Sequence, residues 1–337
     1  MLYTSTRDPV ETYTCYHALN EDRAPDGGFF VPLRLPEIDV ESFRGQTMNQ
    51  VIAEILNICF SVQLTGREID LVIGKAPVRL RTMNHRILIA ESWHNLDWDF
   101  SRMVRNLTAL IRGTRDTEQP CGHWAEIAVR IGVLFGVFSA ADHWQDPLDI
   151  VVPSSDFSDV MSAWYARKMG LPIGNIVICC NENNNLWELI NHGQLRTGRV
   201  AQETTTPLCD QTVPEHLELL IYACGGINEV EIYRKACREG RNYFPDEDVL
   251  GRIREGLHAT VVGRKRLEAA ISGAYATHGY VFGPYSALAY AGLMDYRART
   301  GANADGLILS EFGALLHDEY VAKTMGITLE KLNQILD

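Results

Sequence analysis

The sequence predicts an α/β protein built on a parallel sheet. Two stretches, residues 148–152 and 176–180, are apolar throughout, which is typical of strands that are covered on both faces. Between them, residues 158–169 have the composition of a helix, and Gly170 follows as a helix terminator. A strand, a helix and a second strand in this order form a βαβ unit with parallel strands.

The spacing of apolar residues places the other elements. Helical spacing predicts helices at 47–63 (capped by Thr47), 100–111 (stopped by Gly113), 120–138, 214–223, 228–239, 246–256, 264–277, 284–300 and 328–336. Short apolar runs predict further strands at 87–90, 258–262 and 306–310.

Composition narrows the class of protein. The chain has 337 residues, of which 46% are apolar and 22% charged, as in an ordinary globular protein. A net charge of −12 argues against nucleic acid or an anionic membrane as partner. We expect no membrane span, because no apolar run reaches the ~18–20 residues required. Eight cysteines without a CxxC pair give a zinc site little support, and with no signal peptide they favour a cytoplasmic protein.

A family resemblance rests on residues 150–184, which read IVVPSSDFSDVMSAWYARKMGLPIGNIVICCNENN. This stretch resembles threonine synthases, which carry a PSGNFGD loop, a helix ending in KKMGLPI and a strand ending in TNEN. Weaker matches follow in the same order as in the family, at 3–6 and 24–32, 203–222, 279–292 and 309–319. The resemblance implies a fold-type II, tryptophan synthase β-like large domain that uses pyridoxal phosphate (PLP) to make threonine from O-phosphohomoserine.

The loop that holds the PLP phosphate in the family is altered here. Its counterpart is Ser154, Ser155, Asp156, Phe157 and Ser158, with serines in place of both family glycines and aspartate in place of asparagine. Glycines let the backbone approach a phosphate closely at a helix N-terminus. A carboxylate ~4 Å away costs ~1 kcal/mol per like charge in water and ~4 kcal/mol at an effective dielectric of ~20. The phosphate site is therefore predicted to be degenerate.

The cofactor lysine of the family is also missing. Residues 91–100 read ESWHNLDWDF where the family has ELFHGPTLAFKDF, and Trp98 falls at the lysine position. An indole nitrogen has no usable lone pair and cannot form a Schiff base. Lys75 and Lys168 are the nearest lysines in the sequence, and neither is a natural substitute. We therefore expect no cofactor.

The third departure concerns domain organisation. Family members carry a segment of domain size, including an SGDTG motif, where this chain has only residues 113–119. We expect an N-terminal segment at 1–112, a short linker at 113–119 and an α/β core at 120–337, forming one compact unit. The smaller domain of the family is predicted to be largely deleted.

Candidate catalytic residues are His94, Asp97, Asp99 and Tyr285. The HxxDxD cluster follows a strand and, together with Glu91, could supply acid–base groups or bind a metal. Alternatively, His94 is a remnant of the parent motif and Asp97 caps the next helix. Because neither reading identifies a ligand set, no metal is assigned. Tyr285 replaces a family histidine and could donate a proton.

Candidate pocket residues are Asn181, Glu182 and Asn183, which follow a strand at the usual ligand edge of a parallel sheet, and Ser286. The alternative for the first three is a loop and helix cap. Five scattered histidines are expected only to pack or to lie at the surface: His123, His143, His192, His278 and His317.

Two functions remain open. The first is a pseudoenzyme that has lost PLP-dependent catalysis and binds a protein partner or a small amino-acid-like ligand. The second is a repurposed, PLP-independent enzyme with lyase-like or transferase-like chemistry on an amino-acid or phospho-amino-acid derivative. Either would belong to amino-acid metabolism, and a homo-oligomer stays open as the assembly. Fold analogy cannot choose between them.

Overall fold

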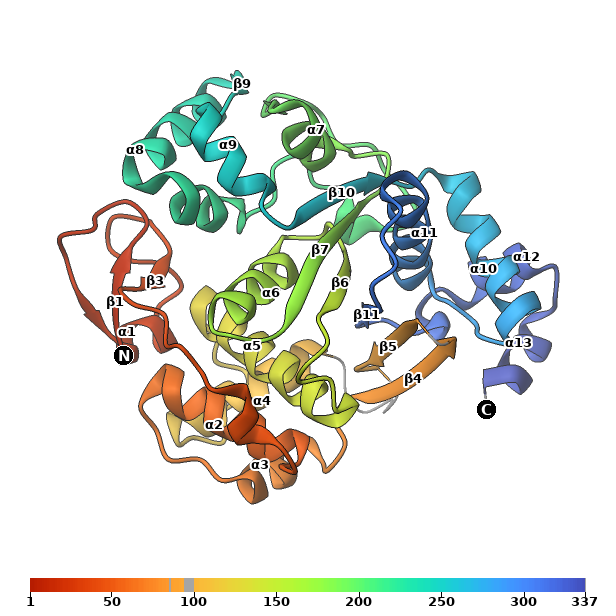
Figure 1. Cartoon of the computed structure of the whole chain (residues 1–337), viewed down its shortest axis with the longest axis horizontal. Helices are drawn as coiled ribbons and strands as arrows, with labels where there is room; N and C mark the ends of the chain where they lie inside the picture. The colour runs from red at the N-terminus through yellow and green to blue at the C-terminus, as the bar shows by residue number, and fades with distance from the viewer. Residues whose placement is uncertain (85, 94–99, 337) are drawn as a thin grey trace.

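The computed structural model describes residues 1–84, 86–93 and 100–336 (Figure 1). The strands are β1 (Leu2–Ser5), β2 (Tyr13–Thr14), β3 (Phe30–Pro32), β4 (Arg79–Asn84), β5 (Ile87–Glu91), β6 (Leu148–Pro153), β7 (Ile173–Cys180), β8 (Leu195–Arg196), β9 (Asn242–Tyr243), β10 (Leu257–Val261) and β11 (Gly306–Ser310). The α-helices are α1 (Cys15–Asn20), α2 (Met48–Phe60), α3 (Gly66–Ile73), α4 (Phe100–Arg112), α5 (His123–Ala141), α6 (Ser158–Lys168), α7 (Asn185–His192), α8 (Leu217–Glu239), α9 (Glu247–Arg254), α10 (Arg264–His278), α11 (Pro284–Thr300), α12 (Asp318–Met325) and α13 (Leu329–Leu336).

The central sheet has six strands in the order β10-β7-β6-β11-β5-β4. Five of them run parallel, and β4 pairs antiparallel with β5 at one edge. Figure 1 shows helices on both sides of this sheet. The predicted α/β class and its βαβ unit, β6-α6-β7, are confirmed.

Both faces of the sheet are buried, as the continuous apolar strands predict. Ile150 and Val152 belong to a core shared with α2, α5 and α6, whereas Val151 belongs to a core shared with α10 and α11. The adjacent Cys180 and Cys179 divide between the same two cores. This alternation follows from the two-residue period of a strand.

Helix α5 bears on the sequence-based expectation about membrane spans. It is 19 residues long with a mean hydropathy of 1.5, so by length and composition alone it could cross a membrane. Glu126 and Arg130 interrupt its apolar sequence, and our expectation of no membrane span stays a prediction. In addition, 72% of the apolar window is buried inside the protein. A buried core helix passes the same test of length and composition.

The N-terminal segment packs directly on the α/β core. Thr47 caps α2 with a full capping box, in which its side chain accepts from the Gln50 N–H and the Gln50 side chain accepts from the Thr47 N–H. Ile52 of α2 and Ile131 of α5 lie in one hydrophobic cluster. The predicted domain boundaries at 112, 119 and 120 stay a prediction.

Candidate functional site

A cleft of about 320 Å³ opens where β6 and β11 end. Parallel strands bring their carboxyl ends to one edge of a sheet, which is where α/β proteins commonly bind ligands. The residues that line the cleft are Ser101, Glu126, Arg130, Pro153, Ser155, Asp156, Asp159, Leu208, Gln211, Tyr285, Leu309, Glu311 and Phe312. Charged side chains dominate one wall, so the cleft is suited to a polar ligand.

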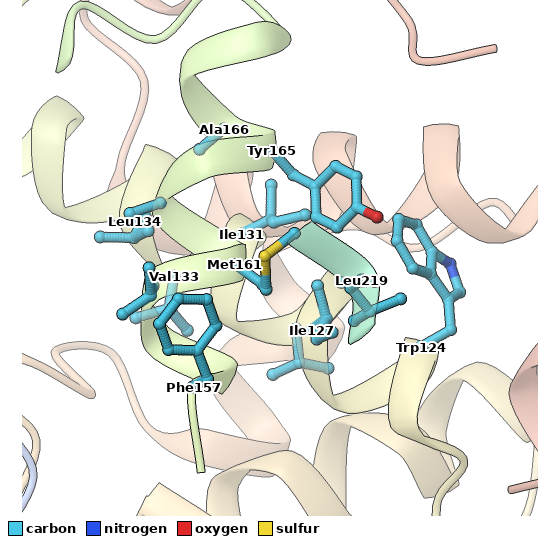
Figure 2. Close-up of a cluster of buried hydrophobic side chains, with 14 of the residues drawn as sticks. Trp124, Ile127, Ile131, Val133, Leu134, Phe157, Met161, Tyr165, Ala166 and Leu219 are labelled. Atoms are coloured by element: carbon cyan, nitrogen blue, oxygen red, sulfur yellow. The ribbon is translucent and has the colours of Figure 1, made fainter. Parts of the chain in front are cut away.

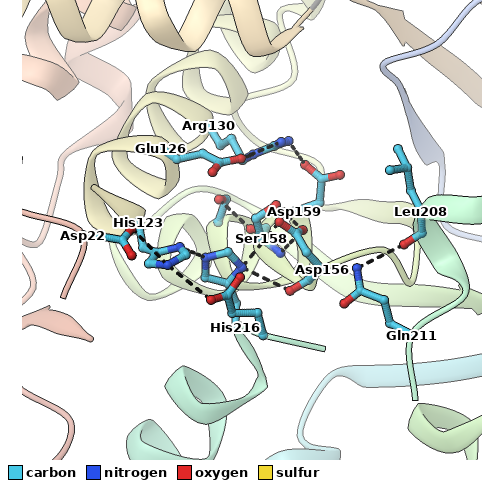
Figure 3. Close-up of polar contacts among 12 residues, drawn as sticks. Asp22, His123, Glu126, Arg130, Asp156, Ser158, Asp159, Leu208, Gln211 and His216 are labelled. Atoms are coloured by element: carbon cyan, nitrogen blue, oxygen red, sulfur yellow. Dashed lines mark hydrogen bonds and ion pairs between the residues drawn. The ribbon is translucent and has the colours of Figure 1, made fainter. Parts of the chain in front are cut away.

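That wall is built around one arginine. Arg130 of α5 donates to Glu126 at 3.0 Å and to Asp159 at 2.5 Å (Figure 3). It also donates to Glu311. The face of the guanidinium lies 4.3 Å from the centre of the Phe100 ring, a cation–π arrangement. One cation is thus shared by three carboxyl groups, which leaves a formal excess of negative charge.

The excess charge changes the protonation of these acids. Burial, with Asp159 close by, outweighs the attraction of Arg130 and raises the pKa of Glu311 to about 8. Burial, Asp156 and Glu126 likewise raise the pKa of Asp159 against the opposing effect of Arg130. Burial opposes the charged form of Arg130, but its three acidic partners hold the arginine pKa well above the usual value. Glu311 can therefore exchange a proton near neutral pH.

The altered loop supplies its own anion to the start of α6. The Asp156 carboxylate accepts from the Ser158 backbone N–H at 3.0 Å and from the Ser158 hydroxyl at 2.7 Å. Burial favours the neutral acid, but His216, Arg130 and the bonds from Ser158 hold the pKa of Asp156 below its usual value. A carboxylate at a helix N-terminus is electrostatically favourable. The position where a bound phosphate would meet this helix is thus occupied by a side chain.

The loop keeps a backbone shape that favours glycine. Ser155 has φ +22° and Phe157 has φ +77°, both in the left-handed region. Phe157 is held there because its ring is buried in the core beside Met161 and Val133 (Figure 2). Both residues therefore hold a backbone conformation that residues with side chains rarely adopt.

Two histidines connect Asp156 to the protein surface (Figure 3). His216, 1% exposed, lies with Nδ1 3.1 Å from the Asp156 carbonyl oxygen and 3.6 Å from its carboxylate. Its Nε2 lies 2.9 Å from Nδ1 of His123. The outer nitrogen of His123 faces Asp22 at 3.2 Å and Glu215 at 3.4 Å. A continuous polar chain therefore runs from exposed carboxylates to the cleft.

The contacts of this chain limit its protonation. A carbonyl oxygen only accepts, so Nδ1 of His216 donates in its contact with the Asp156 carbonyl oxygen, and one proton lies between the two rings. Burial and neighbouring His216 lower the pKa of His123, against the opposing effects of Asp22 and Glu215, which favours the neutral form of this ring. Our expectation that His123 only packs or lies at the surface does not include its contact with His216.

The predicted catalytic residues have different outcomes. Tyr285 lines the cleft, and its hydroxyl accepts from the Leu208 N–H at 3.2 Å. Burial raises the pKa of Tyr285, which keeps the phenol protonated. His94, Asp97 and Asp99, together with Trp98 at the family's lysine position, lie outside the residues that the structure describes. Their roles stay predictions.

The predicted pocket residues lie outside the cleft lining. Asn181 and Asn183 are buried and both donate to Asp210, at 2.7 and 3.0 Å. Glu182 accepts from the Arg264 N–H at 2.8 Å, which satisfies the start of α10. Ser286 is 2.7 Å from the Ser310 hydroxyl, behind the cleft wall. The ligand role of the four residues stays a prediction, as does the alternative of a loop and helix cap for the first three.

The comparisons with known proteins agree on the fold. Residues 2–76 match the family model described as "Threonine synthase N terminus". The PLP-bound threonine synthase of Brucella melitensis superposes with a TM-score of 0.86 at 17% identity, covering 100% of this chain and 94% of that one. Threonine synthase-like 1 of Macaca fascicularis is 29% identical over 42% of this chain, and the threonine synthase of Eremothecium gossypii is 29% identical over 49%. These matches span only 20% and 36% of those two relatives.

The six-stranded sheet, its helical layers and the cleft at its carboxyl edge define the large-domain architecture of fold-type II PLP proteins. Within that class the chain is similar to threonine synthases and threonine synthase-like proteins. The predicted resemblance is confirmed.

The residues that sequence reasoning missed are Glu126, Arg130, Gln211 and Glu311. Arg130 and Glu126 stand four apart on α5, which is a helical ion-pair signal visible in the sequence. Glu311 follows β11 directly, so the rule that ligands bind at carboxyl ends of parallel strands could have found it.

Proposed function

We propose that this protein binds a small amine-bearing ligand of amino-acid type in the cleft and has lost the PLP-dependent reaction of its relatives. One observation carries the proposal: among the described residues, four acidic side chains and a single arginine line the cleft. An ammonium group would relieve that imbalance, and a second anion would increase it. Such a protein would be a PLP-independent, pseudoenzyme-like member of a family in amino-acid metabolism.

The open cleft supports a small molecule as the partner. A protein-binding descendant would be expected to fill its old cleft and expose an apolar patch instead. The volume of about 320 Å³ lies in the range of small-ligand pockets. We propose that the protein acts in the cytoplasm, because all eight of its cysteines are free.

The lysines of this chain do not fit PLP. The sequence has six, Lys75, Lys168, Lys235, Lys265, Lys323 and Lys331, and none of them lines the cleft in the described part of the chain. Lys168 lies over the Trp164 ring, 5.5 Å from its centre, and Lys75 lines a different groove beside α2 and α3. Without an amine in the cleft, no Schiff base can hold an aldehyde cofactor.

The start of α6, where the family loop would hold the PLP phosphate, does not fit PLP either. A phosphate at the start of α6 would compete with Asp156 for the Ser158 N–H, and two anions would be forced together. The described residues thus offer neither a lysine in the cleft that could form a Schiff base with PLP nor a free site for its phosphate. We therefore propose no reaction step through this cofactor.

Glu311 and Tyr285 favour a second candidate function. Both line the cleft, one with a pKa of about 8 and the other a protonated phenol. A carboxyl group that exchanges its proton near neutral pH can act as a general acid or base. The alternative is therefore a cofactor-independent enzyme acting on an amino-acid or phospho-amino-acid derivative.

The proposal can be tested by calorimetric titration with L-homoserine, the other natural amino acids and matched acids that lack the amine, such as 4-hydroxybutyrate. We expect binding of an amino acid and not of its deaminated counterpart. Asp156→Asn should weaken that binding about tenfold, because it removes one charge from the cleft while keeping a helix-capping oxygen. Asp246→Asn is the matched control, since Asp246 caps α9 through the Asp248 N–H at 2.9 Å.

Two results would contradict the proposal. One is equal or tighter binding of the deaminated acids. The other is a PLP absorbance band near ~410–420 nm that borohydride fixes to a lysine. Turnover of a bound amino acid that is lost in Glu311→Gln would favour the enzyme over the binding protein.

A further inference from the structure

A second, chemically opposite pocket lies between the N-terminal sheet and α8, which are neighbours in Figure 1. Its volume is about 270 Å³, and its lining includes Arg7, Arg23, Arg234 and Arg238 against Glu215 and Glu218. We call it the arginine pocket. Four guanidinium groups meet two carboxylates there, in a protein whose net charge is −12.

Two of the four arginines are already neutralised. Arg7 makes a two-pronged contact with Glu218 at 3.0 and 2.8 Å, and Thr6 also donates to this carboxylate at 2.7 Å. Arg23 donates to Glu215 at 2.6 Å and lies over the Phe29 ring, 4.0 Å from its centre. Both carboxylates of the lining are thus paired with an arginine, and these contacts fix the positions of two guanidinium groups.

The other two arginines are unneutralised. Arg234 and Arg238 stand one turn apart on α8, and within the described part of the chain neither has a carboxylate at ion-pair distance. The nearby Asp26 carboxylate accepts from Ser5 and Gly28, each at 2.8 Å. Burial, Arg7 and Arg238 lower the pKa of Arg234, against the opposing effects of Glu218 and Asp26.

We propose that the arginine pocket binds the phosphate group of a small phosphate monoester. Guanidinium groups present planar, paired N–H donors that match phosphate oxygens, and a doubly charged phosphate offsets two unpaired cations. The apolar side of the pocket, formed by Phe29 and Val213, accommodates the organic part of the ligand. This site shares no lining residue with the acidic cleft, and its assignment does not depend on the proposed function.

The test is calorimetric titration of the full chain with inorganic phosphate at low salt, repeated with malonate as a carboxylate dianion. We expect phosphate to bind better than malonate, and Arg234→Gln and Arg238→Gln each to weaken phosphate binding about tenfold. Arg241→Gln is the matched control. Arg241 follows the same helix, is paired with Glu239 at 3.2 Å and lies outside the pocket lining.

Phosphate affinity that survives the double variant Arg234→Gln/Arg238→Gln would overturn the assignment, as would malonate binding equal to that of phosphate. An equal loss in the Arg241→Gln control would also overturn it, because general surface charge would then explain the binding. Circular dichroism of each variant separates a lost site from a lost fold.

Discussion

Glu311 is the residue in which the chemistry of the cleft is concentrated. It follows the last residue of β11, contacts Arg130 and shares that cation with Asp159 and Glu126. Its pKa of about 8 results from burial and from carboxylate neighbours that one arginine cannot compensate. The protonation state of Glu311 therefore depends on the charges of Arg130, Asp159 and Glu126 in the same wall of the cleft.

Replacing Glu311 with glutamine should make stability less dependent on pH. Unfolded glutamate titrates near ~4.3, whereas folded Glu311 titrates near 8, so the native state binds more protons between these values. The free energy of unfolding of the natural protein must then fall as pH rises through this window. Glu311→Gln should gain roughly 2–4 kcal/mol relative to the natural protein between about pH 5 and about pH 8.

Urea unfolding of both proteins at several pH values measures this difference. Glu330→Gln removes an exposed carboxyl group from α13 and serves as the control. A constant difference between Glu311→Gln and the natural protein across the window would show that Glu311 is ionised throughout.

Part of the site follows from local sequence and part does not. Tyr285 and the 154–158 loop were predicted because the family motif fixes their place at the sheet edge. The Arg130–Glu311 contact joins residues 181 apart in the sequence, and no local pattern encodes it. No local pattern encodes the contact between His123 and His216 either, because these residues are 93 apart in the sequence. These contacts join α5 to the residue that follows β11 and to the residue that precedes α8.

At the scale of elements, strongly periodic or well-capped segments were predicted well. The capped helix after Thr47, the strands β6 and β7 and the glycine-terminated α10 all lie within a few residues of their predicted ranges. Short elements such as α3 and the two-residue strands carry too little periodic signal to be found. The two predicted helices at 214–223 and 228–239 correspond to the two helical parts of α8, which meet at a kink at the non-helical residue Gly226.

The kink at Gly226 gives a test of backbone conformation free of packing effects. Gly226 has φ +71° and ψ −167°, a region that essentially only glycine occupies, and an added Cβ would meet nothing within 4 Å. Gly226→Ala should therefore lower the free energy of unfolding by about 1–3 kcal/mol through backbone strain alone.

Gly273 is the matched control, because it lies inside α10 and a Cβ there also meets nothing within 4 Å. Gly273→Ala should raise stability by roughly 0.5–1 kcal/mol, since alanine suits a helix interior. Guanidinium unfolding compares the two variants. Equal effects of the same sign would show that the kink is unstrained.

At the scale of the whole molecule, the α/β core and the N-terminal segment share one hydrophobic interior. Residues 113–122 join α4 to α5, and Arg112 donates to the Leu19 and Pro120 carbonyl oxygens at 3.0 and 2.8 Å. The predicted loss of the family's smaller domain rests on the shortness of this link.

Restoring a lysine alone should not restore the family reaction. We expect Trp98→Lys to form no measurable threonine from O-phosphohomoserine, because the anion loop still carries Asp156 and the cleft remains acidic. Chromatographic measurement of threonine checks this, with Trp98→Lys/Asp156→Asn as a companion variant. Threonine formed by the single variant would refute the expectation.

The contact between Asp156 and Ser158 has one more consequence. A helix end that is completed by a bound anion is fully satisfied only while that anion is present. Here the chain itself supplies the negative group, so the start of α6 needs no external anion to satisfy the Ser158 N–H.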